Sequence, residues 1–486
     1  MTSRFSRLTT NVAQRTRNAP ASTWVVVVMC LVYALYISWL QVDMHRGLGT
    51  FSYDVGLYDQ GLWLLSRGQA PFVTLMGRNL FGDHASFILI FLVPLYWIIP
   101  GTATLLVAQA FAIAAAALPI FFFARRLFND GYIAVLFALV WLVNPAVNGT
   151  NLENFHPDGF LGLTVALAIF AALSSRWRLY AVSLALCLMV KEDVVLLAFP
   201  LGVYIFFVLN KRKGLLTMIA TVTATLVGMF LVMRPLIGVP TRNGWRIPFG
   251  GFRGLLEETI RRPKNVVKYL TEDDRPLYIF QMFAPLLAPV FVAPALAAVA
   301  VPVLASNVIS NFWYQHSIQY HYSIVVMPVL VFATILGVKK VSSQYQRFVV
   351  TAIAVASVST FVAWGQTPLS IHPRPVLPGN HILATTARDI ITVVPDDAVI
   401  SVYDPLTTFM AHRKEVYFFP NPFKAVYYGV DDSLNGQRIP AADRVEYVVL
   451  PKTMTPELEW DWQVVQPEFE LVKENQYWEV FRRRTP

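Results

Sequence analysis

The chain has 486 residues, and its formal net charge is +9 because 39 lysines and arginines outnumber 30 aspartates and glutamates. Only 14% of the residues are charged while 56% are hydrophobic, and mean hydropathy is +0.51. Soluble proteins carry far more charge, so a soluble enzyme and a disordered chain are excluded. The basic residues are spread through apolar sequence rather than gathered on a polar domain, which excludes nucleic acid as a partner. The composition predicts an α-helical polytopic membrane protein.

The predicted membrane segments begin with the uncharged run 23–40, which follows a basic tail at 1–22. No small-residue cleavage site comes after it, so we expect an uncleaved first span. A first outer loop covers 41–102, and within it the short run 86–100 contains Pro94, which favours a re-entrant or interfacial helix. Spans need about 20 mostly apolar residues. Ten further runs make about eleven spans within a transmembrane domain at 23–365: 103–124, 131–147, 159–173, 179–190, 194–209, 215–237, 276–289, 291–309, 322–338 and 348–364.

The orientation follows from short basic clusters, which remain in the cytoplasm. They predict a cytoplasmic N-terminus, an extracytoplasmic C-terminus and a multi-pass protein of the cell membrane whose working face is outside. The clusters are Arg125-Arg126, Arg176 with Arg178, Lys211–Lys213 and Lys339-Lys340.

The segment 366–486 has a different composition, with a proline-rich linker and then alternating helix and strand patterns. A helix at 380–392 and β-rich runs at 398–403, 415–419, 445–450 and 468–481 predict a small extracytoplasmic α/β domain. It contains no glycine-rich phosphate-binding loop, so a nucleotide site is not expected. The two cysteines, Cys30 and Cys187, lie in apolar runs and indicate neither a disulfide framework nor a zinc site.

Ionisable residues gather in five loops that this topology places on the outer face. Asp54 and Asp59 in the first loop are either a general base with an orienting partner or helix-capping and solvated acids. The other loops contribute candidate substrate-binding residues, for which helix capping, a hydrophilic turn or an interfacial aromatic belt is the alternative: Asp83 and His84; Glu153, His156 and Asp158; Lys191 and Glu192; Tyr320 and His321.

No metal or other cofactor is required by these patterns. Histidine and aspartate are compatible with a divalent metal, but no spacing is diagnostic of one. The apolar runs carry almost no ionisable residue at mid-depth, whereas ion-coupled transporters bury some there. This favours an outer-face site that receives a lipid-borne substrate.

Several motifs together resemble an uncharacterised family of bacterial and archaeal polytopic membrane proteins, which is similar to the GT-C superfamily of polyprenyl-phosphate-dependent glycosyltransferases. The resemblance covers about 20–365 and is carried by Tyr53–Gln60 (YDVGLYDQ), Leu62-Trp63, Gly82–His84, Phe155–Asp158 (FHPD) and Tyr320–Tyr322. In GT-C enzymes an acid just after the first span is the catalytic base or positions the acceptor. Asp54 matches that place best and Asp59 is the alternate, although the acidic pair typical of several branches is not found.

The resemblance implies a membrane glycosyltransferase with a GT-C-like fold. Such an enzyme would move a sugar of the arabinofuranose or mannose class from a polyprenyl-phosphate donor to an envelope glycan or glycolipid. The leaving phosphate needs cations or donors, and aromatic rings would stack on sugar. The alternatives are a glycolipid transporter or flippase, and a non-catalytic envelope scaffold. For phosphate the candidates are Arg78, His84, His156, Lys191, His321, Arg242, Arg246 and Arg253, and for stacking Trp63, Trp245 and Trp313.

Overall fold

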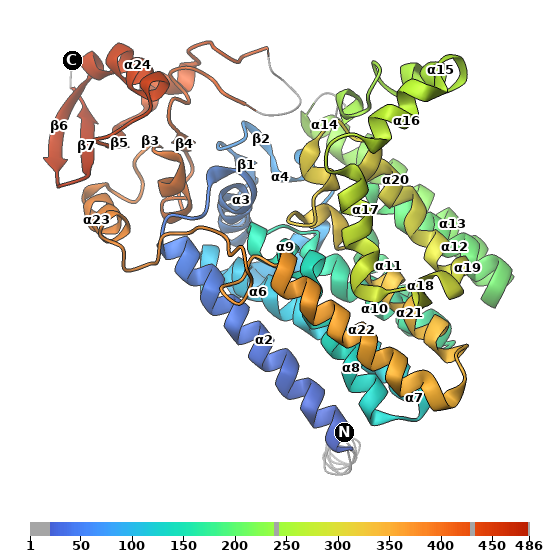
Figure 1. The fold of residues 1–486 in the computed structure, drawn as a ribbon. Coiled ribbons are helices and arrows are strands. Elements are labelled where there is room, and N and C mark those ends of the chain that lie inside the picture. The colour runs from blue at the N-terminus through green and yellow to red at the C-terminus, as the bar shows by residue number, and fades with distance from the viewer. Residues whose placement is uncertain (1–19, 238–242, 428–432, 485–486) are drawn as a thin grey trace, which may run out of the picture.

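The structure is a computed structural model that describes residues 20–237, 243–427 and 433–484. Most of the predicted basic tail, 1–22, therefore lies outside the described residues. A bundle of helices makes up most of the molecule, and a small sheet module sits at the end of the bundle opposite the start of the first helix (Figure 1).

The first part of the bundle starts with α2 (Ala21–Arg46), the longest helix of the described chain. It packs mainly against α6, and α7 packs against α8. The helices that follow the first outer loop are α6 (Thr102–Ala115), α7 (Ala117–Phe128), α8 (Gly131–Leu142), α9 (Pro145–Glu153), α10 (Gly159–Leu173), α11 (Trp177–Leu188), η3 (Glu192–Val194), α12 (Val195–Tyr204), η4 (Ile205–Leu209), α13 (Lys211–Leu226), η5 (Val227–Met233) and α14 (Arg234–Ile237).

The second part of the bundle is interrupted by prolines. Proline lacks a backbone N–H and clashes with the preceding turn, and the predicted spans 276–289 and 291–309 are accordingly broken into short helices. The elements are η6 (Asn243–Arg246), α15 (Phe252–Arg261), α16 (Pro263–Thr271), α17 (Arg275–Phe283), η7 (Ala284–Leu286), α18 (Pro289–Val292), α19 (Pro294–Ala297), η8 (Ala298–Ala300), α20 (Val301–Ile309), η9 (Trp313–His316), η10 (His321–Ser323), α21 (Met327–Lys339) and α22 (Ser343–Trp364).

The membrane assignment is supported by helix length and composition. Five described helices are long and apolar enough to cross a membrane, or six if the pair α8 and α9, bent by 43°, forms one broken span. The remaining apolar helices, such as α10 and α21, are shorter, and about eleven spans stay a prediction. The apolar helix Phe87–Tyr96 has ten residues, which cover only about half of the 30 Å hydrocarbon layer.

The first outer loop folds over the end of the bundle. It contains two short strands that pair with each other, a helix of ten residues and several shorter helices, and the strands and the ten-residue helix lie between the bundle and the tail module (Figure 1). The elements are η1 (Ser52–Gly56), α3 (Leu57–Ser66), β1 (Phe72–Val73), β2 (Arg78–Asn79), α4 (Leu80–Asp83), η2 (Phe87–Leu92) and α5 (Val93–Tyr96).

The tail module confirms the small C-terminal sheet. Its strand order is β4-β3-β5-β7-β6, with β3 parallel to β4 and β5, and β7 antiparallel to β5 and β6. The predicted run 468–481 is a hairpin of two strands, and one helix, α24, was not expected. The elements are α23 (Ile382–Ile390), η11 (Ile391–Val393), β3 (Ile400–Val402), η12 (Asp404–Phe409), β4 (Val416–Phe418), η13 (Pro440–Arg444), β5 (Tyr447–Pro451), α24 (Pro456–Val465), η14 (Gln466–Glu468), β6 (Phe469–Glu474) and β7 (Trp478–Arg483).

The tail module is joined to the first outer loop by polar contacts and by a shared core. The Ser52 N–H donates to Asp404 Oδ1 at 2.8 Å, and the hydroxyls of Thr50 and Thr408 lie 2.9 Å apart. Buried apolar residues of α23, β3 and β7 belong to the same cluster as those of the bundle. The module therefore positions the loop that follows the first helix.

Candidate active site

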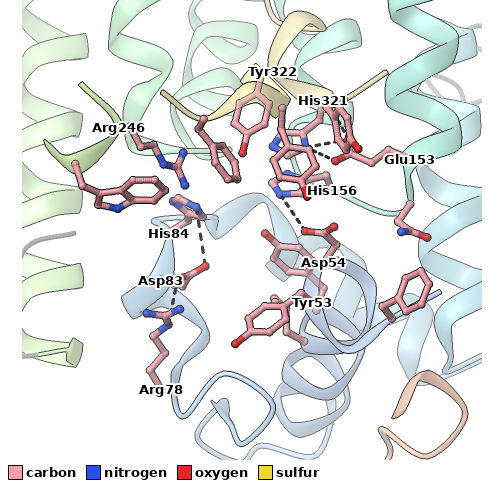
Figure 2. A pocket seen from close by; sticks show the side chains of 18 of the residues that line it. Tyr53, Asp54, Arg78, Asp83, His84, Glu153, His156, Arg246, His321 and Tyr322 are labelled. Carbon is pink, nitrogen blue, oxygen red and sulfur yellow. Dashed lines mark hydrogen bonds and ion pairs between the residues drawn. The ribbon is translucent and has the colours of Figure 1, made fainter. Parts of the chain in front are cut away.

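A cavity of about 480 Å³ lies between the first outer loop and the loops that follow α9, α14 and α20. Its volume is in the range of small-molecule sites. Figure 2 shows its side chains converging on a common space from segments far apart in the sequence. The polar and charged lining residues include Tyr53, Asp54, Arg78, Asp83, His84, Glu153, His156, Arg246, Tyr314, Tyr320, His321, Tyr322 and Arg374.

Asp54 is held on one wall by a strained backbone. Its φ of 67° and ψ of −99° lie outside the regions that a residue with a Cβ normally adopts. Its side chain lines the cavity and is 39% exposed toward it, and the protein packed around it partly desolvates the carboxylate. This burial raises the pKa of Asp54 to about 6, with His156 lowering it and Glu153 and Asp83 raising it further. A carboxylate with such a pKa is suited to take a proton from a hydroxyl near neutral pH.

Two stacked histidines stand next to Asp54. The rings of His156 and His321 are 3.5 Å apart between centroids. His156 Nδ1 lies 2.7 Å from Asp158 Oδ2, and His321 Nδ1 lies 3.0 Å from Glu153 Oε2. Because the ionised Asp158 only accepts, His156 Nδ1 carries a hydrogen. Burial lowers the pKa of both rings, to about 3 for His321, and His156 Nε2 is 4.0 Å from Asp54 Oδ1.

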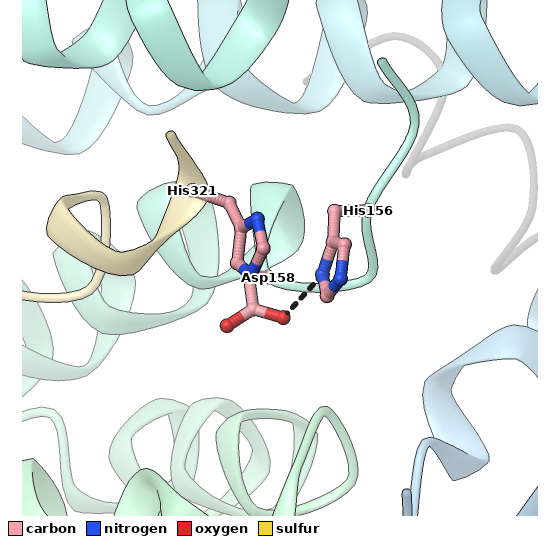
Figure 3. A group of neighbouring side chains, drawn as sticks. All are labelled: His156, Asp158 and His321. Carbon is pink, nitrogen blue, oxygen red and sulfur yellow. Dashed lines mark hydrogen bonds and ion pairs between the residues drawn. The ribbon is translucent and has the colours of Figure 1, made fainter. Parts of the chain in front are cut away.

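The same side chains form a potential metal-ligand set. His156, Asp158 and His321 each offer one ligand atom, all within 4.8 Å of one another (Figure 3). However, Lys191 Nζ lies 3.8 Å from Asp158 Oδ1. Burial favours the neutral amine, but Asp158 and Asp193 outweigh it and raise the pKa of Lys191, so the ammonium stays charged. A divalent cation on the same carboxylate would be repelled by this ammonium, and Lys191 already supplies a positive charge beside Asp158.

The wall opposite Asp54 carries hydrogen-bond donors and positive charge (Figure 2). Arg78 Nε lies 3.2 Å from Asp83 Oδ1, and His84 Nε2 lies 3.9 Å from Asp83 Oδ2. His84 Nδ1 also lies 2.9 Å from Glu192 Oε1. Burial opposes the charged imidazole, yet Glu192 outweighs it and raises the pKa of His84. This wall can stabilise an anion that faces Asp54.

Three arginines were expected from the loop between α14 and α17, and of the two that the structure describes Arg246 lines the cavity. Its guanidinium lies 4.6 Å from the ring centroid of Phe312 and 5.5 Å from that of Trp245, an arrangement that stabilises a cation. Arg253 is exposed on α15, and Arg242 lies outside the described residues.

One cavity residue, Arg374, was not found from the sequence. Its Nη1 donates to the carbonyl oxygens of Leu152 at 2.6 Å and Glu153 at 3.0 Å, at the end of α9. Carbonyls at a helix C-terminus attract cations. The prolines around Arg374 predict only a linker, and nothing in that pattern indicates its contact with the end of α9, which is more than two hundred positions away in sequence.

The remaining predicted residues divide into two groups. Asp83, His84, Glu153, His156, Tyr320 and His321 line the cavity with Asp54. Behind them, the buried Asp158 and Lys191 and the half-buried Glu192 contact the lining residues as described above.

Asp59 is the exception, because the structure does not bring it to the cavity. It is 1% exposed and accepts hydrogen bonds from Tyr96 Oη at 2.7 Å, Thr102 Oγ1 at 2.7 Å and His412 Nε2 at 2.9 Å. Trp63, predicted to stack on sugar, instead stacks on His412. Asp59 therefore ties the first outer loop to the tail module, and of these two aspartates it is Asp54 that lines the cavity.

Comparison with family models identifies the chain. The model "Predicted membrane protein (DUF2079)" matches residues 44–484. The chain belongs to the DUF2079 family. No curated protein matches the sequence.

The fold of this DUF2079 protein is similar to that of ArnT from Cupriavidus metallidurans, a GT-C glycosyltransferase. The structure of ArnT bound to undecaprenyl phosphate matches with a TM-score of 0.55 and 12% identity, covering 95% of this chain and 98% of that chain. The apo structure matches with a TM-score of 0.57 and 14% identity over the same shares. The similarity to the GT-C fold predicted from the sequence is thereby confirmed.

Proposed function

We propose that this DUF2079 protein is a GT-C-type glycosyltransferase that uses a polyprenyl-phosphate sugar as donor. The observation that supports it most directly is the arrangement of one cavity, with Asp54 on one wall and Arg78, His84 and Arg246 across from it. A base and a phosphate-stabilising wall on either side of a sugar-sized space are what glycosyl transfer from a lipid phosphate requires. The ArnT structure, which was obtained bound to undecaprenyl phosphate, adds a fold-level reason for this donor class.

In the proposed reaction an acceptor hydroxyl attacks the anomeric carbon of the donor sugar. A bond forms between that oxygen and the carbon, the bond from the carbon to the phosphate oxygen breaks, and the electron pair leaves with the lipid monophosphate. Asp54 takes the hydroxyl proton, and the cationic wall stabilises the phosphate. Attack from the side opposite the leaving group inverts the anomeric configuration.

The setting of the reaction completes the proposal. The cavity lies at the end of the bundle opposite the start of α2 (Figure 1), and the basic clusters predict that this end is extracytoplasmic. The donor sugar is of the arabinofuranose or mannose class, and the acceptor is an envelope glycan or glycolipid. Lys191 provides the positive charge next to Asp158, so no metal is required.

The test is turnover by the purified full-length protein with a panel of polyprenyl-phosphate sugars and glycan acceptors. We expect product with at least one donor and its loss in Asp54→Asn. The matched control is Asp389→Asn, which changes an exposed aspartate of α23 in the same way. Absence of product with every donor would refute the enzyme, and full activity in Asp54→Asn would refute the assignment of the base.

A further inference from the structure

A second cavity, of about 300 Å³, lies between the start of α17, the loop containing η9 and the end of α22. It shares no lining residue with the first cavity. The side chains that matter for its chemistry are Asp274, Gln281, Trp313, His316, Gln319 and Trp364.

The two cavities are neighbours, separated by the loop 312–322. Tyr314 and Tyr320 line the first cavity and Trp313 lines the second. The Trp313 ring stacks on Tyr314 at 4.0 Å and meets the edge of Tyr320 at 5.4 Å between centroids. A wall of aromatic rings therefore separates the second cavity from the one that holds Asp54.

A backbone contact holds this wall in place. Gly149 of α9 packs against the backbone of Ile318, so closely that a Cβ at this position would overlap the Ile318 carbonyl oxygen. The linker after α22 also reaches both spaces, because His372 lines the second cavity and Arg374 lines the first.

The side chains of the second cavity suit a neutral polyol. Trp313 is 53% exposed and Trp364 is partly exposed, and indole faces pack against the C–H faces of sugar rings. Gln281 and Gln319 offer amide groups that both donate and accept. The lining contains no lysine or arginine, so a phosphate group would find no cation there.

The lining of the second cavity also includes the imidazole of His316. His316 is 4% exposed, and its Nδ1 makes no hydrogen bond within the described chain. This nitrogen has almost no accessible surface, so the imidazole forms part of the cavity wall, and the tryptophan and glutamine side chains are the groups that a bound molecule can reach.

We propose that the second cavity is a carbohydrate-binding subsite, which holds a neutral sugar unit of the acceptor glycan next to the cavity of Asp54. Its role for the acceptor rests on the proposed function, whereas carbohydrate binding itself does not. A membrane lipid is the competing occupant, and the absence of basic lining residues favours the sugar over a phosphate-bearing headgroup.

Binding is tested on the full-length protein in a detergent without a sugar headgroup. Neutral manno- and arabino-oligosaccharides are titrated against wild type, Trp313→Ala and Gln319→Ala, with Trp460→Ala as a control for loss of an exposed tryptophan elsewhere. We expect saturable binding that weakens about tenfold in the two cavity variants, the size of one lost stacking or hydrogen-bonding contact. Trp460→Ala and Asp54→Asn should bind as wild type does.

Three results would overturn the inference. They are no saturable binding to wild type, binding by both cavity variants as tight as that of wild type, or displacement of the sugar by phospholipid headgroups alone. The acceptor role is read separately from Gln319→Ala, which should raise the KM for the acceptor about tenfold with kcat unchanged. An unchanged KM would refute that role. Saccharide binding without turnover of any donor would refute the proposed function and leave the subsite standing.

Discussion

The pH dependence of turnover tests the environment of Asp54 directly. Because the pKa of Asp54 is raised to about 6, the ionised base is lost as the pH falls through 6. Between pH 7 and pH 5 the ionised fraction falls about tenfold, whereas an ordinary aspartate would lose less than about a tenth of it. We expect kcat/KM to fall with the ionised fraction, which gives the pH profile an acidic limb centred near pH 6. Asp54→Asn should abolish this limb and lower the rate about 10²- to 10⁴-fold.

Two neighbouring substitutions should move the limb in opposite directions. His156 lowers the pKa of Asp54 and Glu153 raises it. The limb should therefore shift to higher pH in His156→Gln and to lower pH in Glu153→Gln. The assay is kcat/KM against pH for each variant, with folding checked by thermal melting. A limb that stays in place in both variants, or survives in Asp54→Asn, would refute the electrostatic reasoning.

Three further predictions concern the supporting structure. Lys191→Met leaves the buried Asp158 without its cation and should destabilise the protein by about 3–5 kcal/mol, measured by denaturation. EDTA should leave wild-type turnover unchanged, and a loss of activity in EDTA would contradict the argument that Lys191 supplies the charge beside Asp158. Asp59→Asn weakens hydrogen bonds from three donors and should cost about 2–3 kcal/mol, while the folded fraction keeps its kcat; a loss of kcat without loss of stability would make Asp59 catalytic after all. Gly149→Ala pushes the backbone of Ile318 away. We expect a clear loss of turnover in the activity assay and only a small fall in the melting temperature.

The sequence predicts the parts of this molecule that depend on local patterns. Uncharged runs located α2, α6 with α7, and α22, and the β-rich runs located the strands of the tail sheet. Prolines signalled that 276–309 would be irregular. Many of the charged and polar cavity residues were named as well, because polar residues in short outer loops at a membrane surface converge on one face.

What local patterns cannot show is which loops meet. The sequence favours Asp54 over Asp59 only by resemblance, and in the structure the two are separated by a contact between Asp59 and His412 that spans 353 positions. Arg374 was missed for the same reason, since its carbonyl partners lie 222 and 221 positions away.

The contrast between the two aspartates explains why the tail module belongs to the site. Asp404 of η12 accepts the Ser52 N–H, two residues before the strained backbone of Asp54, and His412 holds Asp59, five residues after it. Strained conformations persist only where their surroundings over-determine them, and here the module fixes the chain on both sides of Asp54. The module therefore helps to fix the direction in which the Asp54 side chain points, even though its own sheet contributes no side chain to the described cavity wall.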